Sequence, residues 1–469
     1  MTGARTLSSD AERESAHVAA TCDQHLPIDQ VSPAAVADLV EQKVAALGGF
    51  ARRHVPHYAD LGLPSPVALD DLPVMDKSTL MLGLPRTVAE PDLQLEDLRR
   101  WVPTDERDGP FQLFRDRYYV RRTSGTTGFV GFFLWDEPQA TAASHAQRRL
   151  LPAVSELPRP LVAVSPVIAL PRYSNILADM HTLPLGLGTT EVVDRLNRLQ
   201  PASVIGSPAF TASLAEEQLA GRLRIAPRVV HVWTERCLPH QRQLIIEAWG
   251  VDPAEPYGTS ETSGIAVRCP QGNFHVLADH VHLELLDRDG RPVPVGGVAE
   301  RVLATRLCGP VQPVLRYELG DVVVRGPDEC PCGRPFPTLS EIRGRTRARL
   351  WLSDPQGRPL ALSAFLLIPV LEDTVGLVRY QLRYDVPGRL EVAIVARPAV
   401  DRPRLIAALT EALRAAGAEP PVIAIVDGAI PDLWAAPPGT KDHHVRIGVD
   451  ETDVEDWLRR RQTGAADLA

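Results

Sequence analysis

The sequence predicts an α/β protein, in which a large N-terminal domain of mixed sheets and helices precedes a small α+β domain. At 469 residues the chain has room for two or three domains of about 150 residues each. Between residues 115 and 345, short apolar runs alternate with helix-like stretches, which is typical of largely parallel strands joined by helices. After Arg345 the order becomes β/α/β/β/α, so we expect domains at 1–345 and 346–469.

The N-terminal segment, to about residue 100, is expected to form helices joined by proline-rich turns. Apolar residues recur at helical spacing over 34–55, and Pro56 ends the pattern. An Asp-Gly turn within 280–307 separates two alternating runs and predicts a hairpin, with a shift towards antiparallel sheet. We expect strands within 160–170, 201–210 and 227–234 and helices at 211–223 and 240–250, followed after the boundary by a hairpin at 347–360, a helix at 363–374, two strands at 378–396 and a helix at 403–418.

Composition excludes several classes of protein. Apolar residues make up 44% and charged residues 23%, as in ordinary globular proteins. With 50 basic and 59 acidic residues the net charge is −9, which disfavours wrapping nucleic acid or coating an anionic membrane. No apolar run approaches the roughly 20 residues of a membrane helix, and the N-terminus does not have the pattern of a secretory signal. We therefore expect a cytoplasmic protein in a reducing compartment.

Six cysteines are too few for a disulfide scaffold in a chain of this length. Cys22, Cys237 and Cys308 are expected to be ordinary small apolar residues. Lysine is rare, because the basic residues are almost all arginine. The lysines are Lys43, Lys77 and Lys441, so chemistry that needs an ammonium group has three candidates.

A run of hydroxyl residues and glycines follows the aromatic segment 111–122. Glycine lets backbone N–H groups converge, and Ser or Thr adds donors, so such a run can bind several phosphate oxygens. An ordinary polar hairpin loop is the alternative. The run comprises Thr123, Ser124, Gly125, Thr126, Thr127 and Gly128.

Two later motifs suit a nucleotide. Tyr257 and Glu261 lie in a Gly-containing turn, where the carboxylate suits magnesium and the tyrosine offers a flat face to a base. Asp321 follows a glycine turn, where an acid can take both hydroxyls of a ribose. Alone, each motif is also compatible with a plain turn.

Taken together and in order, these segments resemble the adenylate-forming superfamily of acyl-CoA synthetases, adenylation domains and luciferases. The best match is the phenylacetate-CoA ligase branch with its capsule-biosynthesis-type relatives. The resemblance runs from residue 69 into the C-terminal domain and includes the segments 121–128, 204–210, 257–264, 313–323 and 341–345. It implies an AMP-forming carboxylate ligase that uses ATP and magnesium.

The resemblance also implies roles for individual residues. The loop Thr123–Gly128 would hold the ATP phosphates, and Tyr257, Gly258 and Thr259 would bind adenine beside the magnesium-binding Glu261. Asp321 would bind the ribose, and Arg345 would contact the nucleotide. Glu235 resembles the acid that ends the adenine-side strand, although its spacing differs by one residue. Lys441, in a Pro-Pro-Gly-Thr-Lys-Asp segment, would stabilise the charge that develops at the α-phosphate; a solvated loop lysine is the alternative.

A second constellation predicts structural zinc. Cys269 and His275 lie just after the aromatic turn, and Cys330 and Cys332 lie just after Asp321. Three thiolates and one imidazole make a closed tetrahedral set, which would join two clusters far apart in sequence. Unmetallated, partly buried cysteines are the alternative, and His280 or His282 could replace His275 as the ligand.

The chain departs from the family at three places. Phe129 and Val130 stand where the family places a Pro-Lys or Lys-Pro pair, both acids of the usual hinge after Arg345 are absent, and 350–360 replaces the glycine-rich segment of true CoA ligases. These losses weaken the expected thioester step more than adenylation. We expect an aromatic or similarly flat acid to be activated and passed to CoA, a carrier-protein thiol or an amine; a homodimer is left open. The rival hypotheses are a non-catalytic nucleotide-binding descendant and a zinc-stabilised interaction protein.

Overall fold

The structure is a computed structural model, and it describes the chain from Ser9 to Arg459 with gaps. The described residues are 9–90, 92–101, 113–123, 130–152, 156–164, 180–183, 187–233, 236–345, 349–396, 400–427, 445–447, 453–454 and 457–459. No helix among them is both long and apolar enough to cross a membrane.

Helices dominate the N-terminal part, as predicted. The longest has its first turn capped by Ser32, whose hydroxyl accepts from the backbone N–H of Ala35, and Pro33 occupies its first position. The helical segments are α1 (Ser9–Cys22), η1 (Ile28–Gln30), α2 (Pro33–His54), α3 (Pro56–Ala59), η2 (Leu69–Asp71), α4 (Lys77–Leu82), α5 (Leu84–Thr87) and α6 (Leu95–Trp101).

Parallel strands follow, each part of a βα alternation. The sheet has the order β4-β3-β5-β6 with all neighbours parallel. Its central strand β5 is buried throughout, as is typical of parallel sheets. Its elements are β3 (Leu161–Val164), β4 (Met180–Leu183), α8 (Thr189–Leu199), β5 (Ser203–Gly206), α9 (Pro208–Leu219), β6 (Val229–Val232) and α10 (Pro239–Trp249). The expected strands and helices of this region are confirmed.

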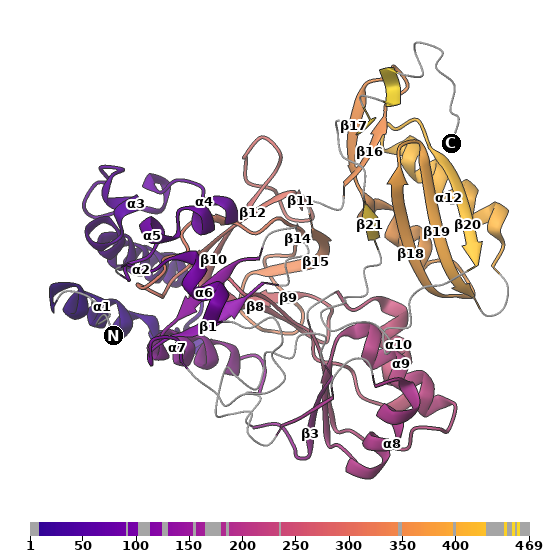
Figure 1. The fold of residues 1–469 in the computed structure, drawn as a ribbon, viewed down its shortest axis with the longest axis horizontal. Coiled ribbons are helices and arrows are strands. Elements are labelled where there is room, and N and C mark those ends of the chain that lie inside the picture. Colours follow the sequence, from indigo (N-terminus) through magenta and orange to yellow (C-terminus); the bar gives the residue numbers. More distant parts are fainter. Residues whose placement is uncertain are drawn as a thin grey trace.

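The strands that follow α10 form antiparallel sheets. A sheet in the order β11-β14-β15-β9-β8-β7 lies beside a smaller sheet, β10-β12-β13, and the predicted hairpin is the β10–β12 pair (Figure 1). The strands are β7 (Pro256–Thr259), β8 (Ser263–Arg268), β9 (Phe274–Val276), β10 (Val281–Leu286), β11 (Val298–Ala299), β12 (Arg301–Arg306), β13 (Tyr317–Glu318), β14 (Asp321–Arg325) and β15 (Thr338–Arg345). The hairpin β1 (Tyr119–Arg122) and β2 (Phe132–Trp135) precedes α7 (Glu137–Arg148).

The elements after residue 345 share a hydrophobic core of their own. The pattern predicted there is confirmed, with two further parallel strands, β20 and β21, at the two edges of the sheet β20-β19-β18-β21. In Figure 1 these orange and yellow elements lie together. They are β16 (Arg349–Ser353), β17 (Pro359–Ser363), η5 (Ala364–Leu367), α11 (Ile368–Glu372), β18 (Leu377–Val386), β19 (Arg389–Ala396), α12 (Arg402–Ala415), β20 (Val422–Asp427) and β21 (Val445–Ile447).

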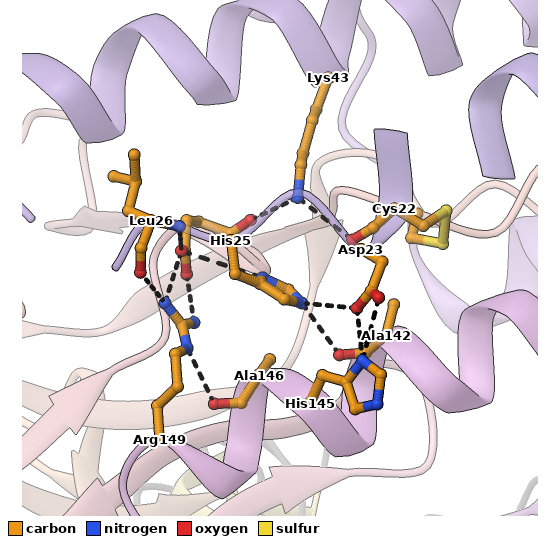
Figure 2. A network of polar contacts seen from close by, with 11 residues as sticks. Cys22, Asp23, His25, Leu26, Lys43, Ala142, His145, Ala146 and Arg149 are labelled. Atoms are coloured by element: carbon orange, nitrogen blue, oxygen red, sulfur yellow. Dashed lines mark hydrogen bonds and ion pairs between the residues drawn. A yellow bond between two sulfur atoms is a disulfide. The ribbon is translucent and has the colours of Figure 1, made fainter. Parts of the chain in front are cut away.

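The end of α1 is fixed to the body of the protein by a disulfide and a buried polar network (Figure 2). Cys22 is bonded to Cys308, 286 residues later, so the expectation that both are ordinary apolar residues is wrong. Next to it, the Lys43 ammonium donates to the carbonyls of Cys22 at 3.3 Å and of Asp279 at 2.9 Å. The Asp279 carboxylate accepts from both terminal nitrogens of Arg149, at 2.6 and 2.7 Å. Burial lowers the pKa of Lys43 to about 8.

Candidate nucleotide site and metal cluster

Thr123 closes the base of the β1–β2 hairpin. Its N–H donates to the carbonyl of Gly131 at 2.9 Å, and its hydroxyl accepts from the N–H of Gly131 at 2.8 Å. A Cβ at position 131 would lie 3.0 Å from the ring of Phe133, so glycine suits this close approach. The hydroxyl-rich segment therefore starts from a buried, doubly hydrogen-bonded strand end.

The turn that carries Glu261 lies against this hairpin. The hydroxyl of Ser260 donates to the carbonyl of Arg122 at 3.2 Å. Within the turn, Thr262 donates through its N–H to the hydroxyl of Thr259 at 3.2 Å. This contact makes the turn that carries Glu261 adjacent to the end of β1, which Thr123 follows.

Glu261 is buried, with 4% of its surface exposed. Its carboxylate accepts from the phenol of Tyr317 at 3.3 Å. The guanidinium of Arg306 donates to the backbone carbonyl of Glu261 at 2.9 Å. A buried carboxylate needs such partners, or a cation, to offset the loss of water.

Tyr257 and Asp321 are in direct contact. The phenol of Tyr257 donates to the Oδ2 atom of Asp321 at 2.7 Å, and Asp321 is buried. These residues come from β7 and the start of β14, at two different places in the same sheet. The structure therefore brings together the acid predicted for ribose and the aromatic residue predicted for adenine.

Arg306 is a functional candidate that sequence reasoning missed. It is fully buried, and besides Glu261 it donates to the carbonyl of Cys308 at 3.0 Å and to the carbonyl of Gln312. Its guanidinium also lies 4.8 Å from the ring centre of Trp135. Burial lowers the pKa of Arg306 to about 9, against the raising effect of the Asp136 and Glu261 charges, so it is a cation at neutral pH.

The predicted cysteine and histidine cluster is assembled. One potential ligand atom from each of the four residues lies within 4.8 Å of all the others, with Cys269 Sγ 3.7 Å from Cys330 Sγ and Cys332 Sγ 3.1 Å from His275 Nε2. His275 is the histidine of the set, while His280 lies buried near His25, their ring centres 5.9 Å apart. Three sulfurs and one imidazole fit zinc.

This cluster joins two hairpins of one sheet. Cys269 follows β8 and His275 lies in β9, whereas Cys330 and Cys332 lie between β14 and β15. In the register of the sheet, His275 pairs with Thr338 of β15 and with Val267 of β8. A bound ion would fix the sheet whose strands β7 and β14 carry Tyr257 and Asp321.

Some predicted residues lie outside the described ones. Gly258 and Thr259 are in place on β7, and the backbone of Arg345 pairs with Asp321 across β14 and β15. Those outside are Ser124, Gly125, Thr126, Thr127, Gly128, Glu235 and Lys441, together with the side chain of Arg345.

Lys77 also went without a predicted role. Its ammonium lies 3.3 Å from the hydroxyl of Thr123. The scarcity of lysine in this chain was the one sequence signal that could have pointed to it.

The fold matches solved acid-CoA ligases over nearly the whole chain. The match to 2-hydroxyisobutyryl-CoA ligase in its postadenylation state has a TM-score of 0.66 at 19% identity, and covers 94% of this chain and 97% of that one. The chain has the adenylate-forming ligase fold. A second structure with this fold, the anthranilate CoA ligase AuaEII in complex with anthranoyl-AMP, matches with a TM-score of 0.50 at 15% identity, over 80% of this chain and 72% of that one.

The sequence is similar to the phenylacetate-CoA ligase branch of the adenylate-forming ligases. Phenylacetate-coenzyme A ligase of Thermus thermophilus is 29% identical over 306 residues, which are 58% of this chain. The alignment spans 66% of that relative's length. No protein-family model matches the chain.

Proposed function

We propose that the protein activates a carboxylic acid with ATP, forming an acyl-adenylate and releasing pyrophosphate. The convergence of Thr123, Glu261 and the Tyr257–Asp321 pair on the adenylate-forming ligase fold supports this proposal. The similarity to a phenylacetate-CoA ligase and an anthranilate CoA ligase favours an aromatic acid. In the first half-reaction a carboxylate oxygen attacks the α-phosphorus, and the bond to the β-phosphate oxygen breaks.

Each residue of the candidate site would have its own role in adenylation. The Thr123 hydroxyl, with the segment to Gly128, binds phosphate oxygens, and Asp321, oriented by the Tyr257 phenol, accepts from the ribose hydroxyls. The Glu261 carboxylate suits a magnesium ion, which would supply charge neutralisation of the phosphates. Lys441 would offset the charge that develops at the α-phosphate.

The acyl group would then pass to an acceptor. With CoA, the thiol sulfur forms a thioester, AMP leaves and one proton is released. CoA is favoured by the relatives, while a carrier-protein thiol or an amine is the alternative that the altered segment 350–360 suggests. The proposal also includes a cytoplasmic location and a homodimer. It places a domain boundary after Arg345, and the residues that follow would form a small mobile domain.

The cysteine cluster is proposed to hold one structural zinc ion. Cys269, His275, Cys330 and Cys332 offer the donor set, and they lie in segments other than the turn that carries Glu261. Zinc there would stabilise the fold rather than react, because a closed set leaves no position for substrate.

The test is pyrophosphate release from ATP and magnesium with a panel of aromatic and aliphatic acids, with and without CoA. We expect release with an aromatic acid, a thioester when CoA is present, and loss of release in Lys441→Ala. If the protein binds ATP but releases no pyrophosphate with any acid, the result would favour a non-catalytic nucleotide-binding descendant. The missing hinge acids suggest this second candidate. No ATP binding would favour the zinc-stabilised interaction protein.

A further inference from the structure

We propose that Tyr317 is a positioning residue for the reaction, which holds the Glu261 carboxylate in the orientation that magnesium binding needs. This inference rests on the proposed ATP-dependent function and deepens it, because it gives a role to a residue that the sequence motifs leave without one. Its basis is a buried carboxylate with few hydrogen bonds, and a phenol that a constrained backbone directs at that carboxylate.

The carboxylate of Glu261 has fewer partners than a comparable buried acid of this protein. Within the part of the chain that the structure describes, its one hydrogen bond comes from the Tyr317 hydroxyl, 3.3 Å from Oε1. Glu90 has 6% of its surface exposed, and both of its oxygens are occupied, one by Arg115 at 2.8 Å and one by the Tyr118 hydroxyl at 2.7 Å. With 4% exposed, Glu261 needs a further partner to offset the loss of water, and a hard cation would supply it.

Tyr317 is fixed by contacts of its backbone and of its ring. It is buried, and its backbone pairs with Ala304 of β12 and with Met75. Its ring meets the ring of Phe133 edge-on, with the ring centres 6.3 Å apart. The phenol therefore has one direction, which is towards Glu261, and removing its hydroxyl would leave the packing of the ring in place.

The preceding residue, Arg316, has a backbone conformation that residues other than glycine rarely adopt. Its φ is 45°, in the left-handed region. Its N–H donates to the hydroxyl of Thr305 at 2.9 Å. Its guanidinium donates to both carboxylate oxygens of Glu284, at 2.8 and 2.9 Å, and to the carbonyl of Leu72 at 2.9 Å. Such a conformation persists only where surrounding contacts enforce it, and here it determines how Tyr317 leaves the chain.

The experiment uses calorimetry to measure the affinity of the full-length protein for the α,β-methylene analogue of ATP, which cannot release pyrophosphate. Titrations with magnesium and without added divalent metal separate the metal-dependent part of the affinity from the rest. We expect Tyr317→Phe to weaken binding about 3- to 10-fold with magnesium, as the loss of one hydrogen bond predicts. Binding without magnesium should be unchanged. Glu284→Gln, which removes the charge that pairs with Arg316, should weaken binding in the same metal-dependent way.

The matched control is Tyr118→Phe, which removes the same hydroxyl from a buried tyrosine–glutamate pair outside the candidate site. It should leave both affinities unchanged. Equal losses with and without magnesium in Tyr317→Phe would mean a structural role and would overturn the inference. Wild-type affinity in the presence of magnesium would overturn it too. If Tyr317→Phe does not fold, Glu284→Gln decides between the same outcomes.

Pyrophosphate release from ATP, measured in the same proteins, separates this inference from the proposed function. A magnesium-dependent loss of affinity in Tyr317→Phe would support the inference even if the wild type released no pyrophosphate with any acid, a result that would contradict adenylation. Pyrophosphate release by the wild type, together with unchanged magnesium-dependent binding in Tyr317→Phe, would overturn the inference alone. No binding of the analogue by the wild type would overturn both.

Discussion

The Nη1 atom of Arg306 donates to the backbone carbonyl of Glu261 at 2.9 Å, and the Nε atom of the same side chain donates to the carbonyl of Cys308 at 3.0 Å. One buried cation therefore joins the acid-bearing turn to the loop that carries the disulfide. Because a guanidinium has five N–H donors in a fixed plane, it can serve several carbonyls that an ammonium or a neutral side chain cannot.

We expect Arg306→Met to destabilise the protein by about 3 kcal/mol or more, because buried carbonyls lose their donor. Pyrophosphate release should fall as well, since the turn with Glu261 is no longer held. Denaturant unfolding and steady-state kinetics measure the two effects. Arg301→Gln on the same strand is the control, because Arg301 pairs with Glu318 while a third of each side chain is exposed, and its loss should cost less than about 1 kcal/mol. Equal stability of the two variants would contradict this role.

The disulfide should contribute measurably to stability. A bond between Cys22 and Cys308 closes a loop of 286 residues, and such a constraint is worth about 2–4 kcal/mol in the usual range. Reductant should therefore lower the free energy of unfolding by that amount. The double variant Cys22→Ala, Cys308→Ala should be less stable at the start and unaffected by reductant; an equal response to reductant in both proteins would refute the assignment.

Local patterns predicted the local structure well. The apolar spacing over 34–55 predicts a helix there, and the structure places α2 at Pro33–His54, within one residue at each end. The metal-ligand spacing likewise selected the four residues that the fold assembles. In both cases the deciding information lies in short segments.

Long-range relationships were not predictable from the same patterns. A cysteine that pairs with another 286 residues away has no local signature, so Cys22 and Cys308 were mistaken for apolar residues. Lys77 lies 3.3 Å from the hydroxyl of Thr123, and Met75 pairs with Tyr317; both are contacts between distant segments. The role of Arg306 could not be predicted from the sequence either, because the burial of an arginine depends on which carbonyls the fold brings around it.

Metal content should follow the cysteine cluster. We expect the purified protein to contain about one zinc ion per chain, and chelation or Cys330→Ala to lower its thermal stability, because the ion joins two hairpins. Elemental analysis and thermal unfolding are the measurements. Cys237→Ala is the control: Cys237 is a buried free cysteine outside the cluster, so its loss should leave the metal content unchanged. A protein without metal, or equal metal content in Cys330→Ala, would contradict the zinc site.

Acid should destabilise the network around α1. Burial, together with the charges of Lys43 and Arg149, lowers the pKa of His25 to about 4, against the raising effect of Asp279. Between pH 6.5 and 4 the unfolded chain binds a proton at His25 that the folded protein does not, so the free energy of unfolding falls as pH falls through this range, by about 3 kcal/mol in total. In His25→Gln the slope of stability against pH should flatten. His231, whose pKa burial also lowers to about 4, lies on β6, and adding His231→Gln should flatten the slope further. An unchanged slope in both variants would show that these histidines do not control the acid response.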